Sequence, residues 1–196
     1  IKAIRESEMD KLTTFMSDSD KNKVLDNYKL INKDSLSEDE FNNKRVFGGR
    51  RQYCFNSKTY HKYSEIIIRE LANHYKNEES IVAWQIDNEF GHEGSDICFC
   101  DECKRAFRDY LKEAYNNNIN RLNEIWGTVF WSQEYNDFDE IPLPAKTITT
   151  HNPSLRMEWE RFRSLSVERY AKMQVDLLKE VLGEDSVVMH DFSGGY

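Results

Sequence analysis

The feature that most constrains this chain is a short, nearly all-apolar run at residues 81–86, followed directly by Asp87, Asn88 and Glu89. An apolar run of this length between polar residues is typical of a strand that is buried on both faces of a parallel sheet. A second run of this kind occupies residues 187–190. Because the segments between the two runs have helical periodicity, their order is that of βα units, and we expect an α/β fold with a parallel sheet.

Apolar residues recur three and four positions apart in several stretches, as they do on one face of an amphipathic helix. Before the first strand, this face comprises Tyr60, Tyr63, Ile67, Leu71 and His74. After the strand, a second face comprises Cys103, Phe107, Tyr110, Leu111 and Ala114. We expect Asp101 to be the N-cap of this second helix, because an Asp side chain there accepts hydrogen bonds from free backbone N–H groups.

Two further helices are expected before the second strand. The shorter one contains Leu122, Ile125 and Trp126, and it should end at Gly127 because glycine is common at helix C-termini. The longer one should begin near Pro153 and end at Gly183. Its predicted buried face comprises Leu155, Trp159, Phe162, Ser166, Tyr170, Met173, Leu177 and Val181.

Residues 1–45 differ in composition from the rest of the chain. They are dense in Lys, Asp, Glu, Ser and Asn, and they contain neither Gly nor Pro. Such a composition favours short solvated helices or disorder over a packed core. We therefore predict a charge-rich lead-in at residues 1–45 and a folded domain at residues 46–196.

The overall composition excludes two classes of partner. With 27 Lys and Arg against 35 Asp and Glu, the net charge is −8, and clustered cations for nucleic-acid binding are missing from the sequence. The mean hydropathy is −0.79 and no run of 18 apolar residues occurs, so no membrane span is expected. The first residues lack the apolar core of a signal peptide, and a cytoplasmic location is the expectation.

All four cysteines fit one metal-binding pattern. Cys98, Cys100 and Cys103 form C-x-C-x-x-C, and Cys54 supplies a fourth thiolate from a distant loop. Four thiolates are the closed tetrahedral ligand set of a structural zinc site, so we predict zinc as a structural cofactor. The alternatives are two disulfides or four unrelated buried thiols. Disulfides are disfavoured in a chain without a secretion signal.

Glu89 is the candidate for catalysis because it follows the end of a buried strand. In parallel α/β folds, the carboxyl ends of the strands form the edge at which active sites are built. The alternative is that Glu89 is an ordinary solvated acid on a loop, and the spacing of residues alone does not decide between the two.

A resemblance to a known family extends this interpretation. Residues 47–57, 83–91, 98–103 and 122–133 carry the motifs FGGRRQYCFNS, AWQIDNEFG, CFCDEC and LNEIWGTVFWSQ, and similar motifs continue to about residue 193. In this order they closely resemble the family 42 glycoside hydrolases, which are β-galactosidases with a (β/α)₈ catalytic barrel. The resemblance implies a β-galactoside substrate, a zinc site at the four cysteines and a homo-oligomer, which is a trimer in the family.

The resemblance also implies roles for individual residues. Glu89 matches the general acid/base of a retaining hydrolase, and Asn88 matches the residue that contacts the sugar 2-hydroxyl. Arg50 matches an arginine that reaches the galactose site, and Trp131 matches an aromatic residue that lines the sugar pocket. For Trp131, ordinary core packing is the alternative.

The sequence departs from the family pattern in its extent. The family's nucleophile is a glutamate after the seventh barrel strand, whereas this chain corresponds to a partial barrel from about the third helix to the fifth strand. No residue here matches that glutamate, so we expect the isolated chain to hydrolyse β-galactosides negligibly. The alternative function is that of a zinc-stabilised fragment that binds carbohydrate or oligomerises without catalysis.

Overall fold

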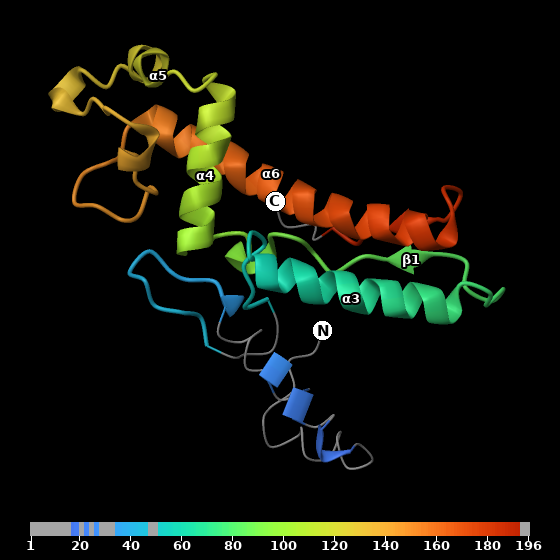
Figure 1. The fold of residues 1–196 in the computed structure, drawn as a ribbon. Coiled ribbons are helices and arrows are strands. Elements are labelled where there is room, and N and C mark those ends of the chain that lie inside the picture. The colour runs from blue at the N-terminus through green and yellow to red at the C-terminus, as the bar shows by residue number, and fades with distance from the viewer. Residues whose placement is uncertain (1–16, 20–21, 24–25, 28–33, 47–50, 193–196) are drawn as a thin grey trace.

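The computed structural model describes residues 17–19, 22–23, 26–27, 34–46 and 51–192. In chain order its elements are α3 (Lys58–Tyr75), β1 (Trp84–Gln85), η1 (His92–Gly94), α4 (Asp101–Ala114), α5 (Ile119–Trp126), η2 (Phe130–Ser132), η3 (Phe138–Glu140), α6 (Pro153–Leu182) and β2 (Val188–Met189). Figure 1 shows α3 and α6 side by side along one half of the molecule, with α4 and α5 at the other end of α6.

The two strands are parallel, as the sequence predicts. Trp84 pairs with Val188 and Gln85 pairs with Met189, and α4, α5 and α6 lie between them in the sequence. The prediction of a strand buried on both faces is wrong for this run. β1 covers only part of it, and Val82 is exposed, because a sheet of two strands covers few of its side chains.

The helix over residues 58–75 is confirmed, and Tyr60 of its predicted buried face packs on α6, but the prediction is wrong for Ile67 and Leu71. Ile67 and Leu71 are 39% and 46% exposed, whereas Ser64 and Ala72 are buried. Ser64 and Ala72 face α6, and the Ser64 hydroxyl lies 2.8 Å from that of Tyr170 on α6. Small side chains let two helices approach closely, so the contact follows Ser64 and Ala72 rather than the larger residues.

The ends of the other helices follow local signals in the sequence. Gly127 ends α5 with a left-handed φ of 62°, and the Asn152 side chain caps α6 by accepting from the Ser154 N–H. The predicted N-cap of α4 is wrong by one residue, because Cys100 is the N-cap and Asp101 is the first helical residue. Asp101 still lies in the first turn, where a negative charge is favourable.

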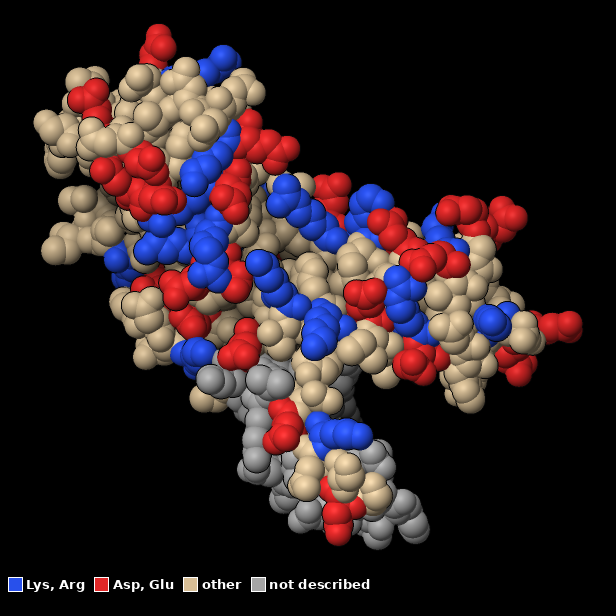
Figure 2. All heavy atoms as spheres, in the orientation of Figure 1, with Lys and Arg blue, Asp and Glu red and all other residues tan. Residues whose placement is uncertain are grey.

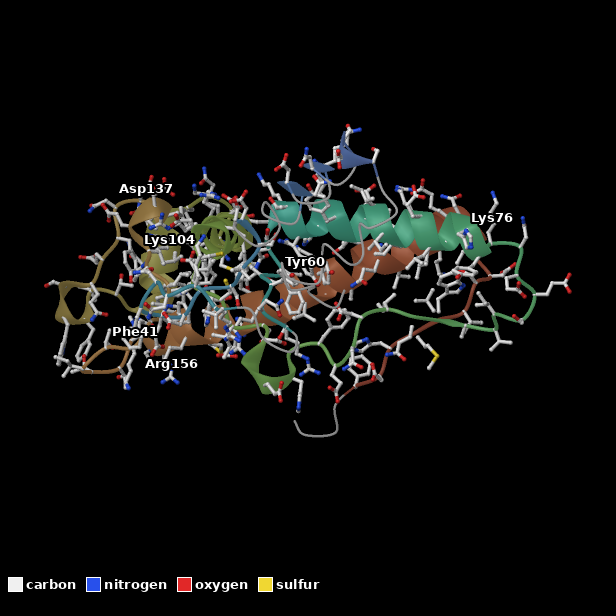
Figure 3. The ribbon with its side chains drawn as sticks, turned by 90° about the horizontal axis from the view of Figure 1, so that it is seen from below. Phe41, Tyr60, Lys76, Lys104, Asp137 and Arg156 are labelled. Carbon is white, nitrogen blue, oxygen red and sulfur yellow. The ribbon has the colours of Figure 1, made fainter. Side chains whose placement is uncertain are left out.

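Buried side chains form two clusters on opposite halves of α6. The larger one joins α4, α5 and the first half of α6 to the four cysteines, and it includes Phe107, Leu111 and Phe162. The smaller one lies between α3, β1 and the second half of α6. Figure 3 shows Tyr60 of α3 directed toward α6, where its ring stacks on that of Tyr170 with 5.1 Å between centroids.

Part of the predicted lead-in pairs with the segment that contains Cys54. The Ser37 N–H donates to the Gln52 carbonyl and the Cys54 N–H donates to the Ser35 carbonyl, at 2.8 and 2.7 Å between donor and acceptor. Both serines are fully buried. Residues 34–46 therefore pack on the main body, and the described residues 18–19, 22–23 and 26–27 are helical.

The surface is charged with both signs intermixed. On the face in Figure 2, acidic and basic side chains are interspersed over α4 and α6. Several form ion pairs within one helix, such as Lys172 with Asp176 on α6. Within the described residues, no helix combines the length and the apolar character that a membrane span requires.

Candidate active site and metal centre

Glu89 lies on a tight turn directly after β1, at the carboxyl end of the parallel strand pair. Asp87 and Glu89 have left-handed φ angles of 45° and 47°, which residues other than glycine rarely adopt. The Glu89 N–H donates to the Asp191 carbonyl beyond β2, at 3.2 Å. Strained backbone of this kind is common at functional sites and persists only where the surroundings hold it.

Among the described residues, Arg51 and Asn88 hold the carboxylate of Glu89. The Arg51 guanidinium forms an ion pair with Oε2, and the Asn88 amide donates to the same oxygen at 3.0 Å. The side chain of Glu89 is 26% exposed and that of Arg51 is 11% exposed. Glu93 contacts the other end of the guanidinium at 3.5 Å and is mostly exposed. The turn thus presents a partly buried carboxylate with charge-assisted hydrogen bonds.

The predicted site residues are brought together only in part. Asn88 and Glu89 are in contact, whereas Arg50 lies outside the described residues. Arg51, which no motif in the sequence singles out, contacts Glu89 instead. The only signal for Arg51 was its position beside Arg50, and two adjacent arginines in a loop give no indication of which one faces the site.

Trp131 lies apart from Glu89. It belongs to η2, is 72% exposed and stacks on Phe130 with 5.6 Å between ring centroids. In Figures 1 and 3, the gold segment that contains η2 lies at the end of the molecule beyond α4, well away from η1 and the turn that precedes it. The alternative that Trp131 packs in the core is therefore wrong, and its contact with sugar stays a prediction.

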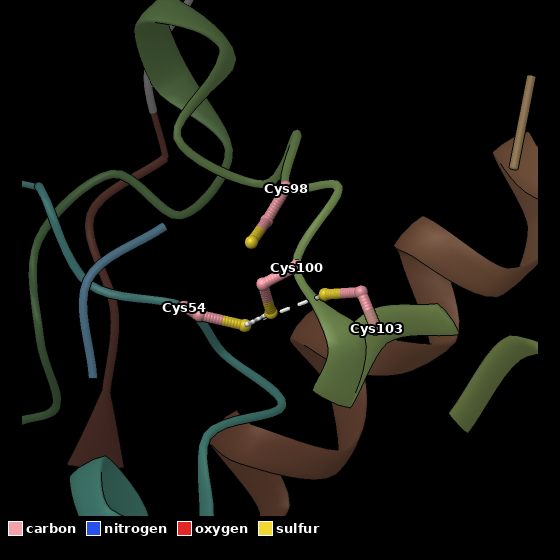
Figure 4. Close-up of side chains that lie close together, drawn as sticks. All are labelled: Cys54, Cys98, Cys100 and Cys103. Atoms are coloured by element: carbon pink, nitrogen blue, oxygen red, sulfur yellow. Dashed lines mark hydrogen bonds between the residues drawn. The ribbon is translucent and has the colours of Figure 1, made fainter. Parts of the chain in front are cut away.

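The four cysteines converge on one point, although Cys54 comes from a different segment (Figure 4). All four are buried and not in disulfides, and their sulfur atoms lie within 4.8 Å of one another. The Sγ atom of Cys54 is 3.4 Å from that of Cys103 and 3.7 Å from that of Cys100. Because Zn–S bonds are about 2.3 Å, tetrahedral sulfur ligands lie about 3.8 Å apart. The distance from Cys54 to Cys100 matches this spacing, and the distance to Cys103 is somewhat shorter.

Polar groups around the sulfur atoms suit thiolates. The Asn56 side chain donates to Cys103 Sγ, and its backbone N–H donates to Cys54 Sγ, both at 3.3 Å. The Glu38 N–H donates to Cys98 Sγ at 3.4 Å. The same Asn56 amide donates to the Ser166 hydroxyl on α6 at 3.2 Å. Such outer hydrogen bonds orient metal ligands.

The thiol pKa values shift in opposite directions within the cluster. Hydrogen bonds from Cys103 and Cys54 lower the pKa of the Cys100 thiol, whereas the hydrogen bond with Cys100 raises the pKa of Cys54. Four adjacent buried thiolates repel one another, and a divalent cation removes this cost. The residues therefore fit a structural zinc ion by ligand type, spacing and outer hydrogen bonds.

Comparison with known proteins identifies the family. The family model of β-galactosidases, glycoside hydrolase family 42, matches residues 30–195. The chain belongs to this family of β-galactosidases. The match begins within residues 1–45, before the motifs that carry the resemblance in the sequence analysis, and it includes residues 34–46, which pack against the main body.

Individual family members are similar over most of this chain. A β-galactosidase of Halorubrum lacusprofundi is 41% identical over 159 residues, which are 81% of this chain and 22% of the relative. A Thermus β-galactosidase is 40% identical over 81% of this chain and 24% of its own length. The chain therefore spans about a quarter of the length of the family members it matches.

Solved structures of family members share the fold. That of the β-galactosidase from the Antarctic haloarchaeon Halorubrum lacusprofundi matches with a TM-score of 0.81 and 38% identity, over 86% of this chain and 25% of that one. That of the β-galactosidase from the psychrophilic Marinomonas ef1 matches with a TM-score of 0.80 and 35% identity, over 86% and 26%. This chain thus has the fold of part of a family 42 β-galactosidase.

Proposed function

We propose that this chain is the part of a (β/α)₈ catalytic barrel from about the third helix to the fifth strand, in a retaining β-galactosidase that uses Glu89 as its general acid/base. The observation that carries the proposal is the carboxylate of Glu89 at the carboxyl end of β1, held by Asn88 and Arg51 beside the parallel strand β2. Barrel enzymes build their active sites at this end of their strands.

In the proposed reaction, Glu89 donates a proton to the glycosidic oxygen while a second carboxylate attacks the anomeric carbon. Glu89 then accepts a proton from the water that releases galactose. The two carboxyl groups of a retaining enzyme lie about 5–5.5 Å apart. The second carboxylate belongs to the seventh strand of the barrel, which this chain does not match. Turnover therefore needs that strand as well as the strand that precedes Glu89.

The neighbours of Glu89 have separate parts in this proposal. Asn88 donates to Glu89, and its proposed role is to contact the sugar 2-hydroxyl. The buried Nε of Arg51 has no partner among the described residues, and a sugar hydroxyl would satisfy it. Arg50 and Trp131 are further proposed contacts to galactose. Residues 1–45 are proposed as a charge-rich lead-in to a barrel domain at residues 46–196, and residues 34–45 of this lead-in pack on the barrel segment.

The test compares E89Q and E89G with wild type, in a polypeptide that includes this segment and the remaining barrel strands. Both variants should lose most of kcat/KM on substrates with poor leaving groups and much less of it on dinitrophenyl β-galactoside, whose leaving group needs no acid. The kcat on the dinitrophenyl substrate should still fall, because the release of galactose lacks its base. Azide should rescue E89G as the galactosyl azide, because a small anion replaces the water that Glu89 activates.

Glu93 supplies a matched control. It contacts the same Arg51 but is largely exposed, so E93Q should keep near wild-type activity. Equal losses in E89Q and E93Q, or full activity of E89Q on lactose, would contradict the proposal. For the 196-residue chain alone, negligible hydrolysis of nitrophenyl β-galactoside is expected, and robust turnover would refute the need for the seventh strand.

We also propose a structural zinc ion at Cys54, Cys98, Cys100 and Cys103. Its support is the sulfur spacing and the N–H donors from Asn56 described above. Bound there, zinc joins two distant segments and supplies no step of the sugar chemistry. Elemental analysis should find one zinc per chain, and a folded but metal-free chain would contradict the site.

The alternative is a zinc-stabilised fragment that oligomerises or binds carbohydrate without catalysis. Oligomerisation is supported by the exposed apolar side chains of α3. Ile67 and Leu71 lie on this face with Ile66. An exposed apolar face of this kind suits contact with another protein surface. Size-exclusion chromatography distinguishes a stable oligomer from a monomer, and calorimetry with galactose detects binding without hydrolysis.

A further inference from the structure

His190 follows β2 directly, and its ring spans the turn that carries Glu89. The ring nitrogen Nδ1 lies 2.7 Å from the carbonyl oxygen of Ile86, the residue that precedes the turn. The other nitrogen, Nε2, lies 3.3 Å from the backbone nitrogen of Phe90, the residue that follows Glu89. One side chain therefore bonds to the backbone on both sides of the turn.

These two bonds define one tautomer of His190. The Ile86 carbonyl only accepts, so Nδ1 carries the hydrogen and donates it. The Phe90 N–H only donates, so Nε2 is unprotonated and accepts. The ring is therefore neutral with its hydrogen on Nδ1, because a second hydrogen on Nε2 would face the N–H of Phe90.

Packing holds the ring in place. It stacks on the Phe90 ring, with 4.4 Å between centroids and 19° between planes. Ile86, which accepts from Nδ1, is buried in the cluster between α3 and α6. The residues between these two anchors include Asp87 and Glu89, whose left-handed backbone persists only where neighbours enforce it.

We propose that His190 is a positioning residue for Glu89, the general acid/base of the function proposed above. By bonding to Ile86 and Phe90, it fixes the separation of the two ends of the turn. The turn then holds the carboxylate of Glu89 against Arg51 and Asn88. The inference rests on the proposed function only for the role of Glu89, since the hydrogen bonds belong to the fold.

The first test is the tautomer of His190 in the 196-residue chain, read from ¹⁵N chemical shifts of the histidine rings at neutral pH. His190 should be the Nδ1–H form. His61 and His151 are internal controls, because each places Nε2 against a carbonyl oxygen, at 2.6 and 2.5 Å, and should be the Nε2–H form. An Nε2–H or charged ring at His190 would overturn the proposal.

The second test is kinetic and uses the same active polypeptide as the Glu89 variants. His190→Phe keeps an aromatic ring beside Phe90 but removes both hydrogen bonds. We expect kcat on lactose to fall about 10- to 100-fold with KM nearly unchanged, because a misplaced catalytic group loses rate rather than binding. His190→Gln offers one amide donor and one acceptor and should recover much of the loss.

The outcomes separate the two proposals. Full activity of E89Q on lactose removes the role of Glu89, whatever the tautomer of His190. Impaired E89Q with unimpaired H190F, or a fall in kcat that H190Q does not recover, overturns the positioning role. If H190F does not fold, two other results decide: the tautomer of His190 in the wild-type chain and the kcat of H190Q. The proposal then expects the Nδ1–H tautomer and a kcat of H190Q near that of wild type, because the Gln amide can replace both hydrogen bonds. An Nε2–H ring or a strongly reduced kcat of H190Q overturns it.

Discussion

A metal ion bound to the cysteine cluster should crosslink two segments that are distant in the sequence, and replacing Cys54 tests this most directly. Cys54 lies 49 positions before Cys103, so a metal ion bound to both closes a loop of that length. For a crosslink of this span, the entropy removed from the unfolded chain corresponds to about 4 kcal/mol at 25 °C. This is a large share of the 5–15 kcal/mol that stabilises a typical domain.

Cys54→Ser and Cys98→Ser form a matched pair for this test. Each variant keeps three thiolates, but only C98S still joins the segment of Cys54 to that of Cys100 and Cys103. In C54S, the remaining ligands lie within residues 98–103, and an ion there closes only a short loop. Zinc should therefore stabilise wild type most, C98S in part and C54S very little.

The assay is thermal unfolding by circular dichroism under reducing conditions, with zinc and with a chelator. For a chain of this size, about 4 kcal/mol corresponds to a shift in Tm of about 8–16 °C. Equal stabilisation of C54S and C98S by zinc would refute the crosslink between the two segments. A wild-type Tm that responds neither to zinc nor to the chelator would refute metal binding altogether.

Three further predictions concern single side chains. Glu158 is buried and accepts a hydrogen bond from the Tyr110 hydroxyl at 2.6 Å. E158Q should therefore lower the free energy of unfolding by about 1.5–3 kcal/mol. Urea titrations of E158Q, Y110F and the double variant should show that the two losses are coupled and not additive. Asn56→Ala removes a donor to a cluster thiol and should weaken zinc binding about 10- to 100-fold in chelator competition, whereas N73A on the exposed face of α3 should not. Burial raises the pKa of the Tyr170 hydroxyl to about 12, so its contribution to stability is complete below pH 10 and is lost as the pH rises toward 12. In urea titrations between pH 10 and 12, Y170F should lose less free energy of unfolding than wild type. Equal losses would contradict the raised pKa of Tyr170.

Helix ends and the cysteine cluster were predictable because their signals are local and chemical. A glycine such as Gly127 accepts the left-handed φ that ends α5, and Pro153 follows a capping Asn152 at the start of α6. The C-x-C-x-x-C spacing requires three thiols to lie near one another, and Cys54 is the remaining candidate. These inferences need no knowledge of how the helices pack.

Features that depend on tertiary packing were not predictable. The buried face of α3 is set by contact with α6, which selects Ser64 and Ala72 over the larger Ile67. Glu158 lies on the same face of α6 as Leu155 and Phe162. Its charge nevertheless predicts exposure, because charged side chains are rarely buried without partners. Besides Arg161 on α6, its partners are the hydroxyls of Tyr110 on α4 and of Tyr115 just after it, which the sequence of α6 cannot reveal.

Residues 51–56 connect the proposed chemistry to the proposed metal. Arg51 pairs with Glu89, the Cys54 thiol lies in the cluster, and Asn56 bonds to Cys103 and to Ser166 of α6. Three residues of extended chain span at most about 11 Å, so Arg51 cannot move far from Glu89 while Cys54 is held. A metal ion at the cysteines would therefore limit the position of the guanidinium, and through it that of the carboxylate, without contacting the sugar. This would account for the proposed ion lying close in sequence to the proposed catalytic carboxylate without touching it, because the rigidity of the adjoining segment would supply the precision that catalysis requires at Glu89.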